Sequence, residues 1–502
     1  MRLGALLESI SVTLPETIPD CDVGAIRTDS RCVRPGDLFV AYPGVRVDGR
    51  AFIDEAKRRG ACAVVVEGDP ASVVSTVPCF PVRSGREAWA LLCRASHGFP
   101  DRALTIIGIT GTDGKTTTAT MLDTILRVAR RRAGLVTTVG ARTGDHLERA
   151  TGLHTTTPDP PELFSLLGAM RAEGRDTAIL EVTSHALAME KVAGIEFDVG
   201  VITNVTRDHL DFHRSPHAYL EAKARLFDGL GRNRRKPGPA WAILNADDRS
   251  FERLSQNPGG QTLSYGIAAV ADVGASDPLH GPRASTFTLR IGERAARVTL
   301  PAPGAHNVLN ALAAAAAAHA LESSLGEIAA GLESFAGVPG RYEIIEQGQP
   351  FSVIVDFAHT PEALRRVLTH ARGSTTGRLI IVIGCAGERD AGKRFPIGAV
   401  AGSTADLSIV TNEDPRGESP GEIAAAIERG IRSVGGRSVT ILDRDEAISH
   451  AIGLGAAGDT ILLAGKGHEQ SLCIGDTEHA WDDREAARRA LAARGYGSRK
   501  AG

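Results

Sequence analysis

The chain has 502 residues and lacks both a surplus of basic side chains and a high aromatic content. Lys and Arg together number 57 against 60 Asp and Glu, which gives a formal net charge of −3. Proteins that bind nucleic acids use basic residues to neutralise phosphates, and they stack bases on aromatic rings. Aromatic residues make up only 4% of this sequence. We therefore expect no nucleic-acid partner.

Long apolar runs and paired cysteines are also missing. No stretch approaches the roughly 18 apolar residues of a membrane span, and the first residues contain no apolar core of a signal peptide. The seven cysteines are odd in number and form no C-x-x-C pair, which excludes a framework in which every cysteine is disulfide-bonded. We expect a cytoplasmic protein with reduced thiols and no membrane partner.

The arrangement of apolar runs predicts three domains of the α/β class. Residues 1–98 contain short strand-like runs and one helical pattern, as in a small α/β domain. Residues 99–338 predict a central parallel sheet of the P-loop type that binds a mononucleotide. Residues 339–502 predict a doubly wound, Rossmann-like sheet. Glycine- and proline-containing segments at 97–100 and 337–341 mark the two boundaries.

The most informative stretch runs from Leu104 to Leu126, where a strand pattern leads into a glycine loop and a helix. Such a loop turns backbone N–H groups toward an anion at a helix N-terminus. Lys115 would reach the β- and γ-phosphates, and Thr116 would hold Mg²⁺. The usual G-x-x-x-x-G-K-[ST] spacing is not met, because position 109 is Ile. The residues predicted to bind the nucleotide here are Gly111, Thr112, Asp113, Gly114, Lys115, Thr116 and Thr117.

Two further residues of the central domain are candidate metal ligands. Glu181 lies at the end of a strand predicted over 176–182, and His209 follows the next strand. The carboxyl ends of parallel strands form the crevice in which such sheets bind ligands. Lys223 lies on a predicted helix, where a lysine is normally solvated, so the pattern alone gives it no role.

Polar clusters follow four strands predicted in the third domain. Arg389 and Arg416 suit carboxylates, whereas Glu413, Asp414 and Glu469 suit an ammonium. An amino acid carries both groups, so this edge predicts an amino-acid site. The four strands are expected over 351–357, 379–384, 407–411 and 460–464.

In the first domain, Ser30 and Arg31 precede a strand. A hydroxyl and a guanidinium there could hold a diphosphate, or the pair could form an ordinary turn with a surface charge. The sequence pattern leaves both interpretations open.

Seven motifs together resemble the Mur ligase family, and within it the enzymes that join a diamino acid to UDP-N-acetylmuramoyl-L-alanyl-D-glutamate. The resemblance covers essentially the whole chain and implies an ATP-dependent ligase of peptidoglycan synthesis, with ATP and Mg²⁺ as cofactors and small-molecule substrates as partners. We expect a monomer. The motifs are TGTDGKTTT at 110–118, TTP at 156–158, EVTSHAL at 181–187, TNVTRDHLDFH at 203–213, FAHTP at 357–361, GERDAGKR at 387–394 and GKGHE at 465–469.

The resemblance also implies roles for individual residues. Mg²⁺ would be held by Thr116, Glu181, His209 and, once carbamylated, Lys223. The nucleotide site would be closed by Asn307, Arg341, Asp356 and His359, and the residues expected to act in catalysis are Lys115, Lys223, His209, Arg341, Asp356 and His359.

The two other substrates would bind at the first and third domains. Ser30 would hold the uridine diphosphate end. The muramoyl peptide would pass Thr156, Thr157, Thr183, Ser184 and Lys191, and the incoming amino acid would contact Arg389, Glu413, Asp414, Pro415, Arg416, Gly465 and Glu469.

One departure from the family bears on the amino acid. Enzymes that add meso-diaminopimelate typically have Asp-Asn-Pro-Arg, where this chain has Glu413-Asp414-Pro415-Arg416. Arg416 suits the second carboxylate of diaminopimelate, but a free charge on Asp414 would oppose it and favour lysine or ornithine. On Arg416 we favour diaminopimelate, with lysine and ornithine as alternatives.

Two other functions compete with this one. A related ligase, such as a folylpolyglutamate synthase, would share the central loop but not the first domain or the EDPR and GKGHE motifs. A non-catalytic, nucleotide-gated interaction protein would be favoured by loss of Lys115, Lys223 or Glu181, and all three are present.

Overall fold

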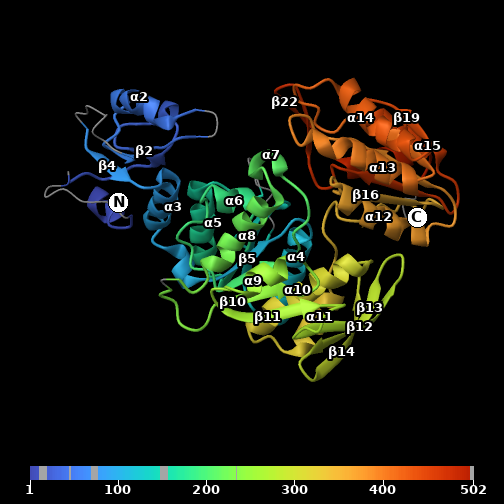
Figure 1. The fold of residues 1–502 in the computed structure, drawn as a ribbon, viewed down its shortest axis with the longest axis horizontal. Helices are drawn as coiled ribbons and strands as arrows, with labels where there is room; N and C mark the ends of the chain where they lie inside the picture. The colour runs from blue at the N-terminus through green and yellow to red at the C-terminus, as the bar shows by residue number, and fades with distance from the viewer. Residues whose placement is uncertain are drawn as a thin grey trace, which may run out of the picture.

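The computed structural model describes residues 1–10, 18, 20–44, 47–68, 77–146, 156–232 and 234–497. Its elements form three units that follow one another along the chain (Figure 1). None of the helices in these described ranges is long and apolar enough to cross a membrane.

The first unit is built on four parallel strands in the order β1-β2-β3-β4. Successive residues of β2 point to opposite faces of this sheet, as the strand period of two requires. Leu38 and Val40 join one apolar cluster, while Phe39 and Ala41 join the other. The elements are α1 (Leu3–Leu7), β1 (Ile26–Arg27), β2 (Leu38–Ala41), α2 (Ile53–Arg58), β3 (Ala63–Glu67), β4 (Cys79–Val82) and α3 (Gly85–Ser96).

The central unit contains a ten-stranded sheet in the order β14-β13-β12-β11-β10-β9-β5-β8-β6-β7. The strands are β5 (Thr105–Thr110), β6 (Ala133–Thr137), β7 (Gly140–Arg142), β8 (Thr177–Glu181), β9 (Val199–Ile202), β10 (Trp241–Asn245), β11 (Gln261–Gly266), β12 (Val273–His280), β13 (Ser285–Ile291) and β14 (Arg294–Leu300). The helices are α4 (Lys115–Val128), α5 (Pro160–Ala172), α6 (Ser184–Ala188), α7 (Leu210–His213), α8 (Pro216–Asp228), α9 (Ser250–Ser255), α10 (Ala305–Ala320) and α11 (Leu325–Glu333).

This central sheet is rich in parallel strands, as predicted, and it also carries antiparallel strands at both edges. Strands β12, β13 and β14 pair antiparallel at one edge, and β7 does so at the other. Ile291 pairs with Arg294, so the β13–β14 hairpin closes through only two residues, the first of them Gly292 with φ 58°. Short connections of this kind join antiparallel strands, whereas parallel strands need a long crossover.

The alanine-rich helix α10 packs directly on α4, the helix that follows the phosphate loop. Its run from Ala313 to Ala318 is fully buried in the same apolar cluster as Met121 and Ile125 of α4. Small side chains allow two helices to approach closely, so this run serves packing.

The third unit is a doubly wound sheet in the order β15-β16-β20-β17-β18-β19, with apolar clusters on both faces. Strands β16, β17, β18, β19 and β20 are parallel, so the four predicted polar clusters lie at one edge. The elements are β15 (Glu343–Ile344), β16 (Ser352–Asp356), α12 (Pro361–Ser374), β17 (Leu379–Ile383), α13 (Arg394–Thr404), β18 (Leu407–Val410), α14 (Pro420–Ser433), β19 (Ser438–Thr440), α15 (Arg444–Leu454), β20 (Thr460–Ala464), β21 (Ser471–Ile474), β22 (Thr477–Ala480) and α16 (Asp483–Ala493).

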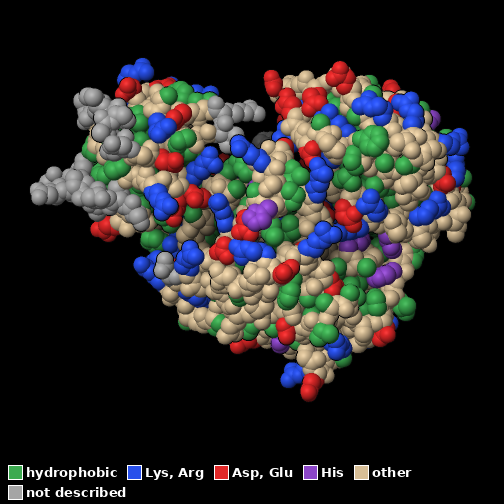
Figure 2. All heavy atoms as spheres, viewed as in Figure 1, with side chains coloured by type: hydrophobic (Ala, Val, Ile, Leu, Met, Phe, Trp, Pro, Cys, Tyr) green, Lys and Arg blue, Asp and Glu red, His purple; other side chains and the backbone are tan. Residues whose placement is uncertain are grey.

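The first and third units sit on opposite sides of the central one (Figure 1). Helix α3 of the first unit packs against α5 of the central unit. The surface is notched between the first and third units, and charges of both signs are interspersed over the face seen (Figure 2). The helices and the mainly parallel strand pairings of the three units confirm the predicted α/β class.

Candidate active site

The phosphate loop is a tight turn between β5 and α4. Gly111 has φ 146° and Gly114 has φ 86°, in the range that favours glycine. A Cβ on Gly111 would lie 1.8 Å from Thr203 Oγ1, and one on Gly114 would lie 2.2 Å from Asn310 Oδ1. Both positions therefore require glycine. The turn brings the N-terminus of α4 to the crevice, where its N–H groups can bind an anion.

Two lysines bind the carbonyl groups of this loop. Lys115 Nζ donates to Gly111 O at 3.1 Å and to Thr112 O at 2.8 Å. Lys223 Nζ, from α8, donates to the same Gly111 O at 2.6 Å. Only 1% of Lys223 is exposed, so the solvated lysine that the helix pattern alone suggests is wrong. Burial, with the charge of Lys115 close by, holds the pKa of Lys223 well below its usual value.

The candidate metal ligands approach the loop from neighbouring strand ends. Glu181 is buried and accepts hydrogen bonds from Thr138 N at 3.3 Å and Thr138 Oγ1 at 3.1 Å. Burial lowers the pKa of Lys115, and the Glu181 carboxylate opposes this effect. Burial likewise lowers the pKa of His209, which also feels the charge of Lys115. Lys115 therefore lies within the electrostatic reach of both groups rather than in bulk solvent.

The donor set can be compared with what Mg²⁺ requires. Within the described ranges, no group of three or more His, Cys, Asp or Glu side chains is placed to hold a metal ion. Thr116 and Glu181 are both buried and offer a hydroxyl and a carboxylate oxygen. Mg²⁺ is usually bound through one or two carboxylates together with substrate phosphates and water. The residues present fit Mg²⁺ on those terms.

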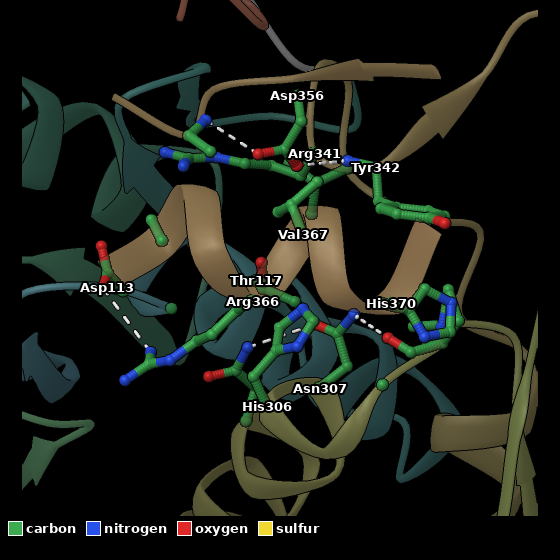
Figure 3. A pocket seen from close by; sticks show the side chains of 18 of the residues that line it. Asp113, Thr117, His306, Asn307, Arg341, Tyr342, Asp356, Arg366, Val367 and His370 are labelled. Carbon is green, nitrogen blue, oxygen red and sulfur yellow. Dashed lines mark hydrogen bonds and ion pairs between the residues drawn. The ribbon is translucent and has the colours of Figure 1, made fainter. Parts of the chain in front are cut away.

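A cavity of about 1420 Å³ opens from the phosphate loop toward the third unit. All four residues that were expected to close the nucleotide site line it: Asn307, Arg341, Asp356 and His359. Figure 3 shows Asn307 on one side and Arg341 with Asp356 on the other.

The wall formed by the third unit is held by short backbone contacts. Asp356 accepts hydrogen bonds from Tyr342 N at 2.7 Å and Ala358 N at 2.8 Å. The Arg341 guanidinium lies 4.4 Å from the centre of the Phe357 ring. Burial lowers the pKa of His359 to about 3, and Lys393 adds to the effect. The His359 ring is therefore neutral at physiological pH.

Arg366 also lines this cavity, although the sequence pattern gives it no role. It lies on α12, and its Nη1 is 3.7 Å from Asp113 Oδ2 in the phosphate loop (Figure 3). Asp113 Oδ2 is buried and has no hydrogen-bond partner among the described residues. An arginine on a helix face gives no sequence signal, because most such residues are solvated.

The residues assigned to the muramoyl peptide gather at the end of β8. Thr157 Oγ1 donates to Glu181 O at 3.0 Å and accepts a hydrogen bond from Thr183 N at 3.0 Å. Further contacts in this group are Thr138 Oγ1 to Thr156 Oγ1 at 3.1 Å, Ser184 Oγ with His213 Nε2 at 3.0 Å and Lys191 Nζ with Asp159 Oδ1 at 2.7 Å.

Ser30 lies in the first unit, away from this group. Its hydroxyl donates to Glu55 Oε2 at 2.7 Å. Arg31 is exposed and pairs with Asp29, which also caps the 3₁₀ turn from Ser30 to Cys32. For Arg31 this geometry favours the ordinary turn with a surface charge.

The predicted amino-acid site contains one unpaired donor and one unpaired acceptor. Glu413 is buried, and its Oε2 has no hydrogen-bond partner within the described part of the chain. Arg416 Nε is buried and unpaired in the same sense. Burial raises the pKa of Glu413 to about 7, against the opposing charge of Lys393. Burial lowers the pKa of Arg389, and the charge of Arg416 adds to this effect. Such a site suits a ligand that carries both an ammonium and a carboxylate.

The other residues of the EDPR and GKGHE motifs shape this site. Gly465 has φ 105°, and a Cβ there would lie 2.3 Å from Glu413 Oε2. Pro415 is buried. Asp414 Oδ1 accepts hydrogen bonds from Lys466 Nζ at 2.8 Å and Cys473 N at 2.9 Å. Asp414 is therefore not the free negative charge that the sequence argument assumed.

Comparisons with known proteins agree with this geometry. The chain matches the Mur ligase family catalytic domain over residues 22–97, the Mur ligase middle domain over 109–318 and the Mur ligase glutamate ligase domain over 340–467.

Two curated relatives match nearly the full chain. The UDP-N-acetylmuramoyl-L-alanyl-D-glutamate–2,6-diaminopimelate ligase of Bacillus licheniformis is 40% identical over 94% of this chain and 95% of its own. The UDP-N-acetylmuramyl-tripeptide synthetase of Roseiflexus sp. (strain RS-1) is 41% identical over 99% of this chain and 100% of its own.

A solved structure of a UDP-N-acetylmuramoyl-L-alanyl-D-glutamate–2,6-diaminopimelate ligase superimposes with a TM-score of 0.67 at 29% identity. It covers 99% of this chain and 100% of its own. Since the three family models together match most of its length and relatives about 40% identical match nearly all of it, the chain belongs to the Mur ligase family.

Proposed function

We propose that this protein is an ATP-dependent ligase that joins meso-diaminopimelate to UDP-N-acetylmuramoyl-L-alanyl-D-glutamate in peptidoglycan precursor synthesis. The observation that carries the proposal is the pair of unpaired buried atoms, Glu413 Oε2 and Arg416 Nε, at the edge of the third sheet. They match the amino and carboxyl groups of an incoming amino acid. The names of the relatives support the same substrates over a folylpolyglutamate synthase or a non-catalytic protein.

The reaction would begin with transfer of the γ-phosphoryl group of ATP to the γ-carboxylate of the D-glutamate residue, which gives an acyl phosphate and ADP. Lys115 and the N-terminus of α4 would neutralise the charge of the transferring group, since phosphoryl transfer depends mainly on positioning and electrostatics. Bound Mg²⁺, held by Thr116 and Glu181 with His209 nearby, would supply further positive charge there.

The second step would be attack of the diamino acid on the acyl phosphate. Its unprotonated amine adds to the carbonyl carbon, and the tetrahedral intermediate expels phosphate while the nitrogen loses a proton to leave an amide. Glu413 accepts a hydrogen bond from the attacking amino acid's ammonium end, and Arg416 holds its carboxylate. The third unit, through Arg341 and His359, closes the nucleotide cavity and shields the acyl phosphate from water.

We propose that Lys223 is carbamylated in the active protein. Its lowered pKa leaves part of the population as a neutral amine, which can add to CO₂ and lose a proton to form a carbamate. The carbamate would turn a buried cation beside Gly111 into a carboxylate-like group that could hold a second metal ion.

The remaining features of the protein are proposed on the same basis. The domains are taken as 1–98, 99–338 and 339–502, and each matched family segment falls within one of them. Uridine diphosphate would bind near Ser30, and the muramoyl peptide near Thr156, Thr183 and Lys191. We also propose a monomer that works in the cytoplasm.

Phosphate release from ATP tests the function. The protein is assayed with UDP-N-acetylmuramoyl-L-alanyl-D-glutamate and, separately, with diaminopimelate, lysine and ornithine. We expect release that depends on diaminopimelate. Release with none of the three would contradict the proposal and favour an interaction protein.

A further inference from the structure

Lys466 contacts two carboxylates of the predicted amino-acid site, and neither the sequence motifs nor the proposed roles assign it a function there. It follows Gly465 at the end of β20 and is 0% exposed. Its Nζ is 2.8 Å from Asp414 Oδ1 and 2.6 Å from Glu469 Oε2. Each of these carboxylates belongs to the set that would surround the incoming amino acid. One buried ammonium group therefore forms ion pairs with two carboxylates of the predicted site.

The loop that carries Asp414 is fixed from the opposite side by the β21–β22 hairpin. Cys473 N donates to Asp414 Oδ1 at 2.9 Å, and Arg416 N donates to Cys473 O at 3.2 Å. Asp414 and Arg416 have φ values of 42° and 53°, so the loop turns sharply at both residues. The position of Asp414 therefore helps to determine where the Arg416 guanidinium lies.

The charges around Lys466 show why its ammonium matters. Arg444, the next buried cation, makes two hydrogen bonds of 2.7 Å to Asp483. It therefore has a carboxylate partner of its own. Burial lowers the pKa of Lys466, but the carboxylates of Glu469 and Asp414 together outweigh burial and raise that pKa above its ordinary value. Without Lys466, the Asp414 carboxylate, whose side chain is 14% exposed, would lose its ion pair of 2.8 Å at a position two residues from Arg416. It would compete with a substrate carboxylate for that guanidinium.

We propose that Lys466 is a positioning and specificity residue that lets this site accept an amino acid with a second carboxylate although position 414 is an aspartate. The inference rests on the proposed function. Lys466 neutralises Asp414 and thereby leaves Arg416 free for the distal carboxylate of diaminopimelate. Lysine has no such carboxylate and depends on Lys466 far less.

Four variants test this role: K466Q, D414N, the double variant K466Q/D414N and the control K236Q. The side chain of Lys236 is also largely shielded, with 6% exposed, and it pairs with Asp198 at 2.6 Å, but it lies in the central unit away from the amino-acid site. Each variant is assayed for kcat and KM with diaminopimelate and with lysine at saturating ATP and dipeptide substrate. Where lysine reacts too slowly for a KM to be determined, its inhibition constant against diaminopimelate is measured instead. Thermal melting of each variant measures stability.

We expect K466Q to raise the KM for diaminopimelate by about tenfold or more, with a much smaller change in kcat and in the constant for lysine. K466Q/D414N should restore the diaminopimelate KM to within about threefold of the parent, because the unneutralised carboxylate is gone. K236Q should lower the melting temperature without changing the preference between the two amino acids.

Two results would overturn the inference. The first is a preference between diaminopimelate and lysine that is the same in K466Q as in the parent. The second is a KM for diaminopimelate that stays as high in K466Q/D414N as in K466Q. If K466Q does not fold, D414N alone decides. If Lys466 neutralises Asp414, D414N should change the preference between diaminopimelate and lysine by less than about threefold. If the Asp414 charge is free, D414N should increase the preference for diaminopimelate by about tenfold. Loss of activity in the parent with every amino acid would instead contradict the proposed function.

Discussion

Lys223 and Lys466 are fully buried lysines, and each has a defined set of oxygen partners. Lys466 retains its charge because two carboxylates contact it, so its pKa is raised. Lys223 contacts only a backbone carbonyl in the hydrogen bonds that the described residues show, and burial lowers its pKa. The same side chain is thus suited to ion pairing at one site and to carbamylation at the other.

Replacement of Lys223 by Ala tests its role. We expect kcat to fall by at least about a hundredfold, because the proposed carbamate is lost. Without it, no group at this position helps to stabilise the charge of the transition state. Added formate or acetate should restore part of the activity, since a small carboxylate can occupy the space of the carbamate. Full activity of K223A in bicarbonate-free buffer would show that Lys223 has no catalytic role.

Glu413 predicts a pH dependence of stability. Its pKa is raised from 4.5 to about 7 in the folded protein, so the neutral form is favoured by folding. That stabilisation is complete below pH 4.5 and is lost as the pH rises through 7, and it is worth up to about 3 kcal/mol.

The measurement is the melting temperature of the unliganded protein between pH 4.5 and 8. The parent should lose stability over this range relative to E413Q, which cannot ionise at this position. Parallel curves for the two proteins would show that Glu413 is already ionised and paired in the folded state.

At the scale of elements, the turns that follow the strands determine the site. β20 is followed by Gly465, whose φ of 105° and close approach to Glu413 exclude a side chain. The loop after β18 bears the EDPR motif, and the β21–β22 hairpin supports it through Cys473. These turns bring the acids and the guanidinium together at one sheet edge.

Gly465→Ala should raise the KM for the amino acid by about tenfold or more and lower the melting temperature, because the new Cβ displaces Glu413 and strains the backbone. The KM for ATP should change little. Gly453→Ala is the matched control, since Gly453 lies within α15 and a Cβ there meets nothing within 4 Å. Equal effects of the two substitutions would contradict the account of this turn.

At the scale of the whole molecule, the third unit contacts the phosphate loop across the nucleotide cavity through Arg366 and Asp113. Both side chains are partly exposed, so the pair contributes about 0–1 kcal/mol to stability. Its larger effect is on the nucleotide, because Arg366 offsets a carboxylate that would repel phosphates.

Arg366→Gln should therefore raise the KM for ATP by about three- to tenfold with little change in melting temperature. Asp113→Asn in the R366Q background should reverse most of that rise. A KM for ATP that is unchanged in R366Q would show that Arg366 does not act on the phosphate loop.

The sequence predicted much of this architecture and less of its detail. The strand patterns located β5, β8, β9, β16, β17, β18 and β20, because buried parallel strands read as apolar runs. The antiparallel strands β12 to β14 were missed, since their half-exposed pattern is weaker and the prediction followed the parallel frame.

The residues missed by the sequence analysis share a physical cause. Lys466 and Arg366 were missed, and the pattern alone misjudged Lys223, because a charged side chain is normally solvated. Only three-dimensional contacts reveal that Lys466 and Lys223 are buried and that Arg366 faces Asp113. Asp414 was misinterpreted for the same reason. Its neutralising partner lies 52 positions away in the sequence.

The central claim is that the phosphate loop, a carboxylate substrate and the Glu413–Arg416 site act in a single ligation. Mass spectrometry of the reaction with ATP, UDP-N-acetylmuramoyl-L-alanyl-D-glutamate and diaminopimelate tests it most directly. The account predicts one new amide product, the UDP-muramoyl tripeptide, with ADP and phosphate formed in equal amounts to it. ATP hydrolysis without that product, or no consumption of ATP, would contradict the account.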